Sequence, residues 1–332
     1  NNYLTEFSKD VPAVEGVYKD GISVISPLRT WSDDFSFNIA GVPALRNDFQ
    51  DSDFMRSHYH SQFDTEETYN EDAFKFHLNL YGLLTMHYDK TAVVPLDFTT
   101  RLNAMKETID ENAFEQAEVS KDELIDEIDH VMDTAKDVNK RVAKINEDYL
   151  NALAKDDQAA AKKLYNESRQ LNSDLLAAFK HAEDSFTRLT WEDVVIFPYE
   201  DAQNNINNLS LSIEALEDGD LAKPLDEYLW NIDNNWYAYD FDQEVFDYFT
   251  DYVIDAPAEK LMWGAGRIVG HEDLYEVIHS LKEKSDIENA DLTEEIESLK
   301  QSLTNQKALL KTTTSEQVAD LRELGRQLEN LK

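Results

Sequence analysis

The chain of 332 residues contains no cysteine, few glycines and no long apolar run. The absence of cysteine excludes disulfides, thiolate zinc sites and cysteine nucleophiles. No stretch of 18 apolar residues occurs, so no membrane-spanning helix is predicted. GxSxG, HExxH, P-loop and dinucleotide-binding motifs are all missing, so no enzyme class is identified by a single local motif. Because the sequence begins at Asn1 rather than Met, we expect a processed product or a fragment.

Basic residues are also scarce. The chain has 31 Lys and Arg against 68 Asp and Glu, which gives a net charge of −37. Such a surface repels nucleic acids and anionic membranes, and it can attract cationic substrates. Hydrophobic residues make up 42% of the chain and aromatic residues 11%, too many for a disordered protein. The composition therefore indicates a folded, soluble, acidic protein.

The first hundred residues differ from the rest of the chain. They hold several glycines and prolines and short β-rich runs such as residues 22–25. A turn at Gly41 is predicted to enter a buried strand over residues 42–45. Apolar residues then recur at helical spacing from Glu71 to Asp89. This part of the sequence resembles the end of an α/β domain.

From Thr99 onward, helical periodicity dominates. An apolar stripe over residues 120–150 predicts one long helix, with further helices at 157–190 and at 201–217, the latter ending near Gly219. An aromatic-rich segment at 228–252 is interpreted as core or as a protein–protein interface, buried across a two-fold axis. The leucine-rich end at 285–332 predicts a helical hairpin or a short coiled coil, interrupted at residues 311–315.

The candidate metal-binding residues are few. His58 and His60 flank Tyr59 in a loop, and imidazoles at loops suit zinc, but this spacing alone does not establish a site. Paired carboxylates carry little information in a chain this acidic, and the glycines at 264 and 266 are interpreted as a turn.

Four segments occur in a fixed order along the first hundred residues. They are Gly-Val-Pro at 41–43, Tyr-His-Ser-Gln-Phe-Asp-Thr at 59–65, Phe-Lys-Phe-His-Leu at 74–78 and Val-Val-Pro-Leu-Asp-Phe at 93–98. This set resembles the end of the peptidase domain in the glutamate carboxypeptidase II and transferrin receptor family, which has Gly-Ile, Tyr-His-Ser-x-Tyr/Phe-Glu/Asp-Thr, Lys-Tyr-His-Leu and Val-Leu-Pro-Phe in the same order. Upstream, Trp-Ser-Asp-Asp-Phe at 31–35 is similar to the family's Gly-Ser-Asn/Asp-Asp/His-Phe segment.

The resemblance implies a three-part organisation. Residues 1–98 are expected to be the α/β remnant of a zinc-exopeptidase domain. Residues 99–284 are expected to form a mostly α-helical, transferrin-receptor-like dimerisation domain, followed by the C-terminal helical hairpin at 285–332.

The resemblance also implies site residues. His60 matches the family's last zinc ligand, Tyr59 the tyrosine that faces the reacting carbonyl, and Ser32, Asp33 and Arg46 match substrate-pocket positions. Members of the family hold two zinc ions, whose other ligands and general base belong to the N-terminal half of the domain. No motif for these precedes Ser32, so this chain alone is expected to be inactive.

Two departures from the family bear on the substrate. Asp48 stands where another basic residue is expected, and Trp263 and Gly264 replace a Lys-Tyr pair that grips a C-terminal glutamate. Without these donors a terminal carboxylate lacks its charge-assisted partners. An aminopeptidase acting on peptides is therefore the expected activity of the parent protein.

The expected partners are a peptide substrate, the N-terminal half of the peptidase domain and a second copy in a homodimer, with no nucleic acid and no membrane span. An extracellular or cell-surface location is expected. Two alternatives stay open. One is a non-catalytic, receptor-like binding or scaffold protein on the peptidase fold. The other is a purely helical surface-layer or adhesion protein, which leaves the order of the segments at 41–98 unexplained.

Overall fold

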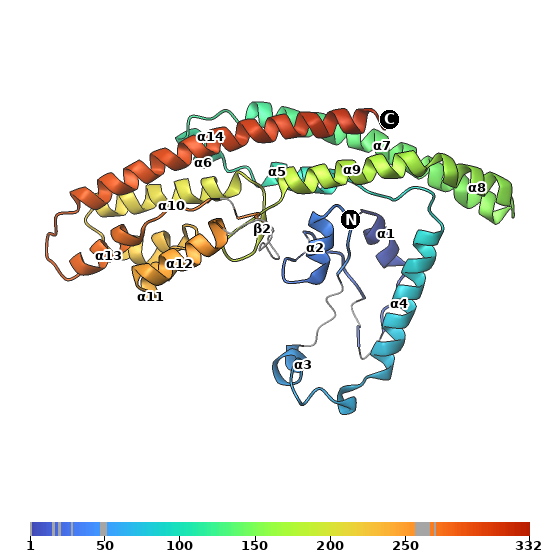
Figure 1. Cartoon of the computed structure of the whole chain (residues 1–332), viewed down its shortest axis with the longest axis horizontal. Helices are drawn as coiled ribbons and strands as arrows, with labels where there is room; N and C mark the ends of the chain where they lie inside the picture. Colours follow the sequence, from blue (N-terminus) through green and yellow to red (C-terminus); the bar gives the residue numbers. More distant parts are fainter. Residues whose placement is uncertain are drawn as a thin grey trace.

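The structure is a computed structural model that describes residues 2–14, 17–18, 21–27, 29–46, 52–255, 266–268 and 270–332. Helices dominate these residues, which confirms the prediction of a mostly helical protein. Figure 1 shows long helices running side by side along one edge of the molecule, with the N-terminal elements below them. None of the helices in the described ranges combines the length and apolarity needed to cross a bilayer.

The long helices form the main core. α7 (Asp122–Ala154) presents the predicted apolar stripe, and α14 (Thr293–Glu329) packs along it and along α9 (Arg169–Phe186) and α10 (Glu200–Glu217). The shorter helices α5 (Thr99–Glu107), α6 (Glu111–Gln116) and α8 (Gln158–Glu167) cover this body. The stripe is confirmed because its central residues are fully buried: Leu124, Ile128, Val131, Ala135 and Val138.

A second core lies towards the other end of α10. After a two-stranded antiparallel hairpin, β1 (Arg188–Leu189) and β2 (Val195–Ile196), α10 ends at a left-handed Gly219 as predicted. The chain then forms the short turns η2 (Pro224–Tyr228) and η3 (Leu229–Asn231), followed by α11 (Tyr237–Asp240), α12 (Gln243–Ile254) and α13 (Tyr275–Lys284). The aromatic segment is split between core and surface, since Phe246 is buried and Tyr248 is exposed.

Of the two forms predicted for the C-terminal end, a helical hairpin or a short coiled coil, the hairpin is wrong. Residues 293–329 form the single helix α14, and its middle section includes the polar stretch that was expected to break it. Thr313 and Thr314 are buried in this stretch, and the Thr314 hydroxyl donates to the carbonyl of Leu310 at 2.7 Å. Threonine satisfies its hydroxyl inside a helix in this way, so the polar stretch does not end the helix. Leu310 before this stretch and Val318 and Leu321 after it pack in the same main core, whereas Leu299, further towards the start of the helix, packs in the second core.

The N-terminal part is helical and irregular. It comprises α1 (Asn2–Lys9), α2 (Asp33–Ile39), α3 (Ser52–Ser57), the turn η1 (Glu66–Thr68) and α4 (Glu71–Asp89), whose bounds match the prediction. The predicted strands at 22–25 and 42–45 are not formed; among the described residues before α5, strand pairing is limited to the isolated bridge between Val14 and Tyr18. A strand persists only where a neighbour takes its backbone hydrogen bonds, and these two segments have no such neighbour there.

Two asparagines attach this part to the helical body. Asn146 of α7 accepts hydrogen bonds from the backbone N–H groups of Ala92 and Val93, both at 2.9 Å, and donates to the carbonyl of Val93. Asn172 of α9 accepts from the N–H of Val94 at 2.7 Å and donates to the carbonyl of Ala92. Five hydrogen bonds therefore fix the buried connection at residues 92–94.

Candidate functional site

The residues expected to serve the metal lie on the surface. His60 follows α3 in a turn with a positive φ of 55°, and the Tyr59 ring stacks on its imidazole with centroids 3.8 Å apart. Both side chains are exposed. Within the described ranges no group of three or more His, Asp or Glu side chains is placed to hold a metal ion. A catalytic zinc site needs at least three protein ligands, so the residues present do not form one by themselves.

The expected substrate residues are grouped around the start of α2. The Ser32 hydroxyl donates to Asp34 at 2.7 Å, and Arg46 donates to the carbonyl of Trp31 at 3.3 Å. The structure thus brings Arg46 to the segment that holds Ser32 and Asp33. Figure 1 shows α3, which precedes Tyr59 and His60, well separated from α2. Asp48, Trp263 and Gly264 lie outside the described residues.

Contacts with the helical body hold this segment in place. Thr30 donates to the carbonyl of Asp193 in the β1–β2 turn at 2.7 Å, and the Trp31 indole donates to the Asp193 carboxylate at 3.0 Å. At the end of α2, Gly41 has a φ of +90° and lies against Lys180 of α9, where a Cβ would come within 2.9 Å of the lysine side chain. Glycine is therefore required here on two counts.

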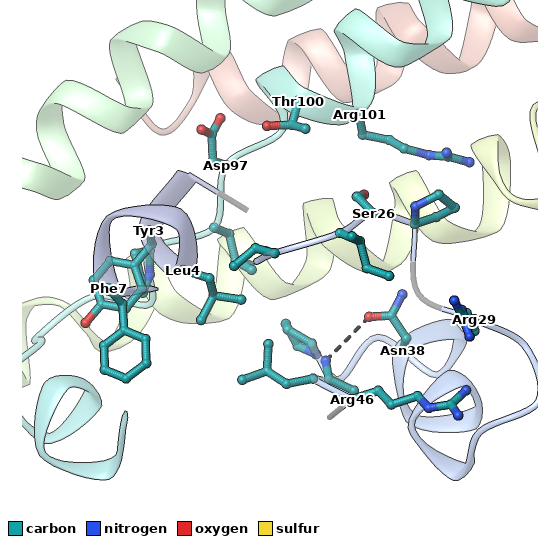
Figure 2. A pocket seen from close by; sticks show the side chains of 18 of the residues that line it. Tyr3, Leu4, Phe7, Ser26, Arg29, Asn38, Arg46, Asp97, Thr100 and Arg101 are labelled. Atoms are coloured by element: carbon teal, nitrogen blue, oxygen red, sulfur yellow. Dashed lines mark hydrogen bonds between the residues drawn. The ribbon is translucent and has the colours of Figure 1, made fainter. Parts of the chain in front are cut away.

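A cavity of about 650 Å³ opens between these elements. Its walls come from α1, the extended residues 21–27 and 43–46, α4, α9 and the segment 95–101. Figure 2 shows Arg29, Arg46 and Arg101 on one side of this view, and the side chains of Tyr3, Leu4 and Phe7 on the other. A cavity with a cationic side and an apolar side suits an amphipathic ligand with carbonyl or carboxylate oxygens. Of the residues expected to serve the site, only Arg46 lines it.

Arg101 and Glu183 are two half-buried charged residues in the lining of this cavity. The Arg101 guanidinium lies 3.8 Å from the centroid of the Phe197 ring and donates to the carbonyl of Phe186. Burial lowers the pKa of Arg101 and raises the pKa of the Glu183 carboxyl, while a hydrogen bond from Thr187 and the charge of Arg101 act against the latter shift. The two residues place a guanidinium and a carboxyl group in the same cavity.

Sequence reasoning missed Arg29, Arg101 and Glu183. No local motif marks them, because they come from a loop, α5 and α9 and meet only in the folded chain. The only general signal in the sequence is that basic residues are scarce, so that few arginines are available to form a cationic site. Three of them line this one cavity.

A second cluster of titratable residues lies between α10, α14 and residues 270–274. Asp233 accepts hydrogen bonds from the Asn205 amide at 3.2 Å and from the backbone N–H of Glu272 at 2.6 Å. Gln306 of α14 donates to the Glu272 carboxylate at 2.8 Å. Burial and the charge of Asp233 raise the pKa of Asp201 to about 8, and burial raises that of Asp233 to about 6. The hydrogen bonds of this cluster connect α10, Asp233, Glu272 and α14.

This cluster predicts a pH-dependent stability. With its pKa raised in the folded state, Asp201 keeps its proton while the unfolded chain loses it, so stability falls as pH rises from about 4 to about 8. Relative to the wild type, the free energy of unfolding of Asp201→Asn should therefore be higher at about pH 8 than at about pH 5.5, by about 1–2 kcal/mol. Urea denaturation at both pH values measures this change. Asp286→Asn, an exposed substitution with the same charge change, should show no such gain, and equal behaviour of the two variants would contradict the assignment.

Comparisons with protein-family models, with curated proteins and with solved structures gave no match.

Proposed function

We propose that this chain is the C-terminal part of a dizinc metallo-exopeptidase that removes N-terminal residues from peptides. In this proposal His60 is a zinc ligand, Tyr59 faces the reacting carbonyl, and Ser32, Asp33 and Arg46 contribute to the substrate pocket. The remaining ligands come from the N-terminal half of the peptidase domain. The chain alone is inactive, because a single exposed histidine does not hold a zinc ion.

The observation that carries the proposal is an exposed apolar face on α4. One side of this helix packs on α1 through Phe76 and Leu80. Another side exposes Phe74, Leu78 and Tyr81 by 55%, 62% and 51%, at the i, i+4, i+7 spacing of a continuous stripe. A helix with apolar residues on two sides is expected between two packed layers, so this face supports a missing layer of the same domain.

The rest of the N-terminal part supports the same reading. More than half of the exposed large apolar side chains of the described chain lie between Ile25 and Tyr88. A concentration of exposed apolar side chains in one part of the chain indicates an interaction region. The extended residues 21–25 and 42–46 have β-rich sequences but no neighbouring strand among the described residues, and a sheet from the N-terminal half would supply one.

The cavity chemistry suits a peptide end. Its three arginines can donate hydrogen bonds to carbonyl or carboxylate oxygens: Arg29, Arg46 and Arg101. The carboxyl groups of Glu183 and Asp97 in the same lining can pair with an α-amino group. The aminopeptidase assignment rests on that acidic pair and on the absence of the Lys-Tyr pair. We extend the proposal to a homodimer and to an extracellular or cell-surface location.

Activity assays distinguish the enzyme from the receptor-like alternative. We expect the full-length parent to hydrolyse leucine amide faster than dipeptides with an acidic C-terminal residue, and this chain alone to hydrolyse neither. Faster cleavage of the acidic dipeptides would contradict the aminopeptidase assignment. A parent with no peptidase activity would favour a non-catalytic scaffold, to which the exposed aromatic residues of α12 also fit.

A further inference from the structure

Four aromatic rings form an exposed surface that consists of three residues of α12 and Phe241, which lies just before this helix. This α12 aromatic surface consists of Phe241, Tyr248, Phe249 and Tyr252, with Tyr248 and Tyr252 exposed by 63% and 60%. The rings contact one another: Tyr248 and Tyr252 stack at 6.3 Å, Tyr248 meets Phe249 at 5.7 Å, and Phe249 meets Phe241 at 6.1 Å. Figure 1 shows α12 on the side of the helical body away from α14. Contiguous exposed rings of this kind indicate a binding surface.

Carboxylates surround these rings. Asp247 and Asp251 stand four residues apart on α12, directly beside the row made by Tyr248 and Tyr252. Further exposed acids lie at both ends of the helix, and residues 224–255 contain no lysine or arginine. In the part of the chain that the structure describes, none of the exposed acids of this region forms an ion pair: Asp240, Asp242, Glu244, Asp247, Asp251 and Asp255.

Aromatic faces beside carboxylates recognise cations. An ammonium or guanidinium group gains from the ring quadrupole and from the nearby negative charge together. The chain uses the first of these interactions internally, since the Lys282 ammonium lies 4.3 Å from the centroid of the Tyr239 ring and donates to the Tyr239 carbonyl at 3.1 Å. The α12 aromatic surface offers the same chemistry to a partner, with the added charge of its acidic row.

We propose that the α12 aromatic surface docks a lysine- or arginine-rich segment of a partner polypeptide. A second copy of this chain is a poorer occupant, because a two-fold contact on α12 brings like-charged acidic rows together. A bare acidic patch would attract any cation weakly, whereas the rings add apolar area and cation–π contacts that need a side chain with an aliphatic stem. This inference does not depend on the proposed peptidase.

Isothermal titration of the chain with a short synthetic peptide of alternating lysine and alanine tests the proposal. We expect binding that weakens with salt, and no binding of the matching glutamine–alanine peptide. Tyr248→Ala/Tyr252→Ala and Asp247→Asn/Asp251→Asn should each weaken binding about tenfold or more. All four side chains are exposed, so the variants should stay folded.

Matched variants elsewhere act as controls. Tyr165→Ala on α8 removes an exposed ring away from α12, and Asp122→Asn/Asp126→Asn on α7 removes the same charge at the same spacing. Both should change the affinity less than about twofold. Equal weakening by the α7 and α12 acid pairs would reduce the binding to general attraction by an acidic protein and overturn the proposal. A dimer that dissociates in Tyr248→Ala/Tyr252→Ala would assign the surface to a second copy instead.

Discussion

His60→Ala in the full-length parent should lower both zinc content and leucine-amide hydrolysis, the latter by at least about 100-fold. The loss follows from the proposed role, because a dizinc site depends on each ligand and even residues behind the ligands contribute about 10- to 100-fold. The structure makes this variant informative, since His60 is exposed and its main contact is the stacked ring of Tyr59. Its removal should therefore leave the fold intact.

His58→Ala is the matched control for this substitution. His58 stands two residues earlier, stacks on Phe54 at 5.8 Å and hydrogen-bonds to the Ser57 hydroxyl at 2.7 Å. It should keep zinc and activity within about twofold of the wild type, as is usual for surface substitutions. Retention of both by His60→Ala, or equal losses in the two variants, would remove His60 from the proposed site.

Asn146→Ala should destabilise the chain by about 3 kcal/mol. The substitution removes three hydrogen bonds and leaves the N–H groups of Ala92 and Val93, which are buried, without their acceptor. An unsatisfied buried backbone group costs about 1–3 kcal/mol, which is more than the net value of a typical hydrogen bond. The urea midpoint of unfolding, with its slope checked for two-state behaviour, measures the effect.

Asn151→Ala on the same helix tests whether the clamp causes this loss. Asn151 is exposed, so its replacement should change stability by less than about 0.5 kcal/mol. A loss for Asn146→Ala no larger than that of the control would show that the connection at 92–94 is satisfied by other groups. The connection matters for the candidate site because the residues that follow it, Pro95, Leu96 and Asp97, line the cavity.

The helices were the most predictable part of the fold. Residues 71–89 and the stripe from Leu124 to Val138 both show apolar residues at the 3.6-residue period of a helix. The end of α10 was equally readable, because Gly219 adopts the left-handed conformation that stops helices. These signals are local, so they can be interpreted without knowledge of the tertiary contacts.

The errors arose where distant contacts decide the outcome. A strand at 22–25 depends on neighbours that the segment itself does not encode. The continuity of α14 through Thr313 and Thr314 depends on the packing of Leu310, before them, and Val318, after them, in the main core. The candidate site shows the same limit. Arg46 was found through its resemblance to a family motif, while Arg101 and Glu183 are joined to it only by the packing of α5 and α9 around the cavity.

In the proposed enzyme, this chain supplies one part of a zinc centre that another part of the same domain completes. Elemental analysis of zinc in the full-length parent and in this chain, purified under the same conditions, is the decisive experiment. We expect two zinc ions per parent molecule and none held by this chain. A metal-free parent would rule out the zinc enzyme and favour a receptor-like scaffold, and stoichiometric zinc in this chain alone would contradict the assignment of the missing ligands to the N-terminal half.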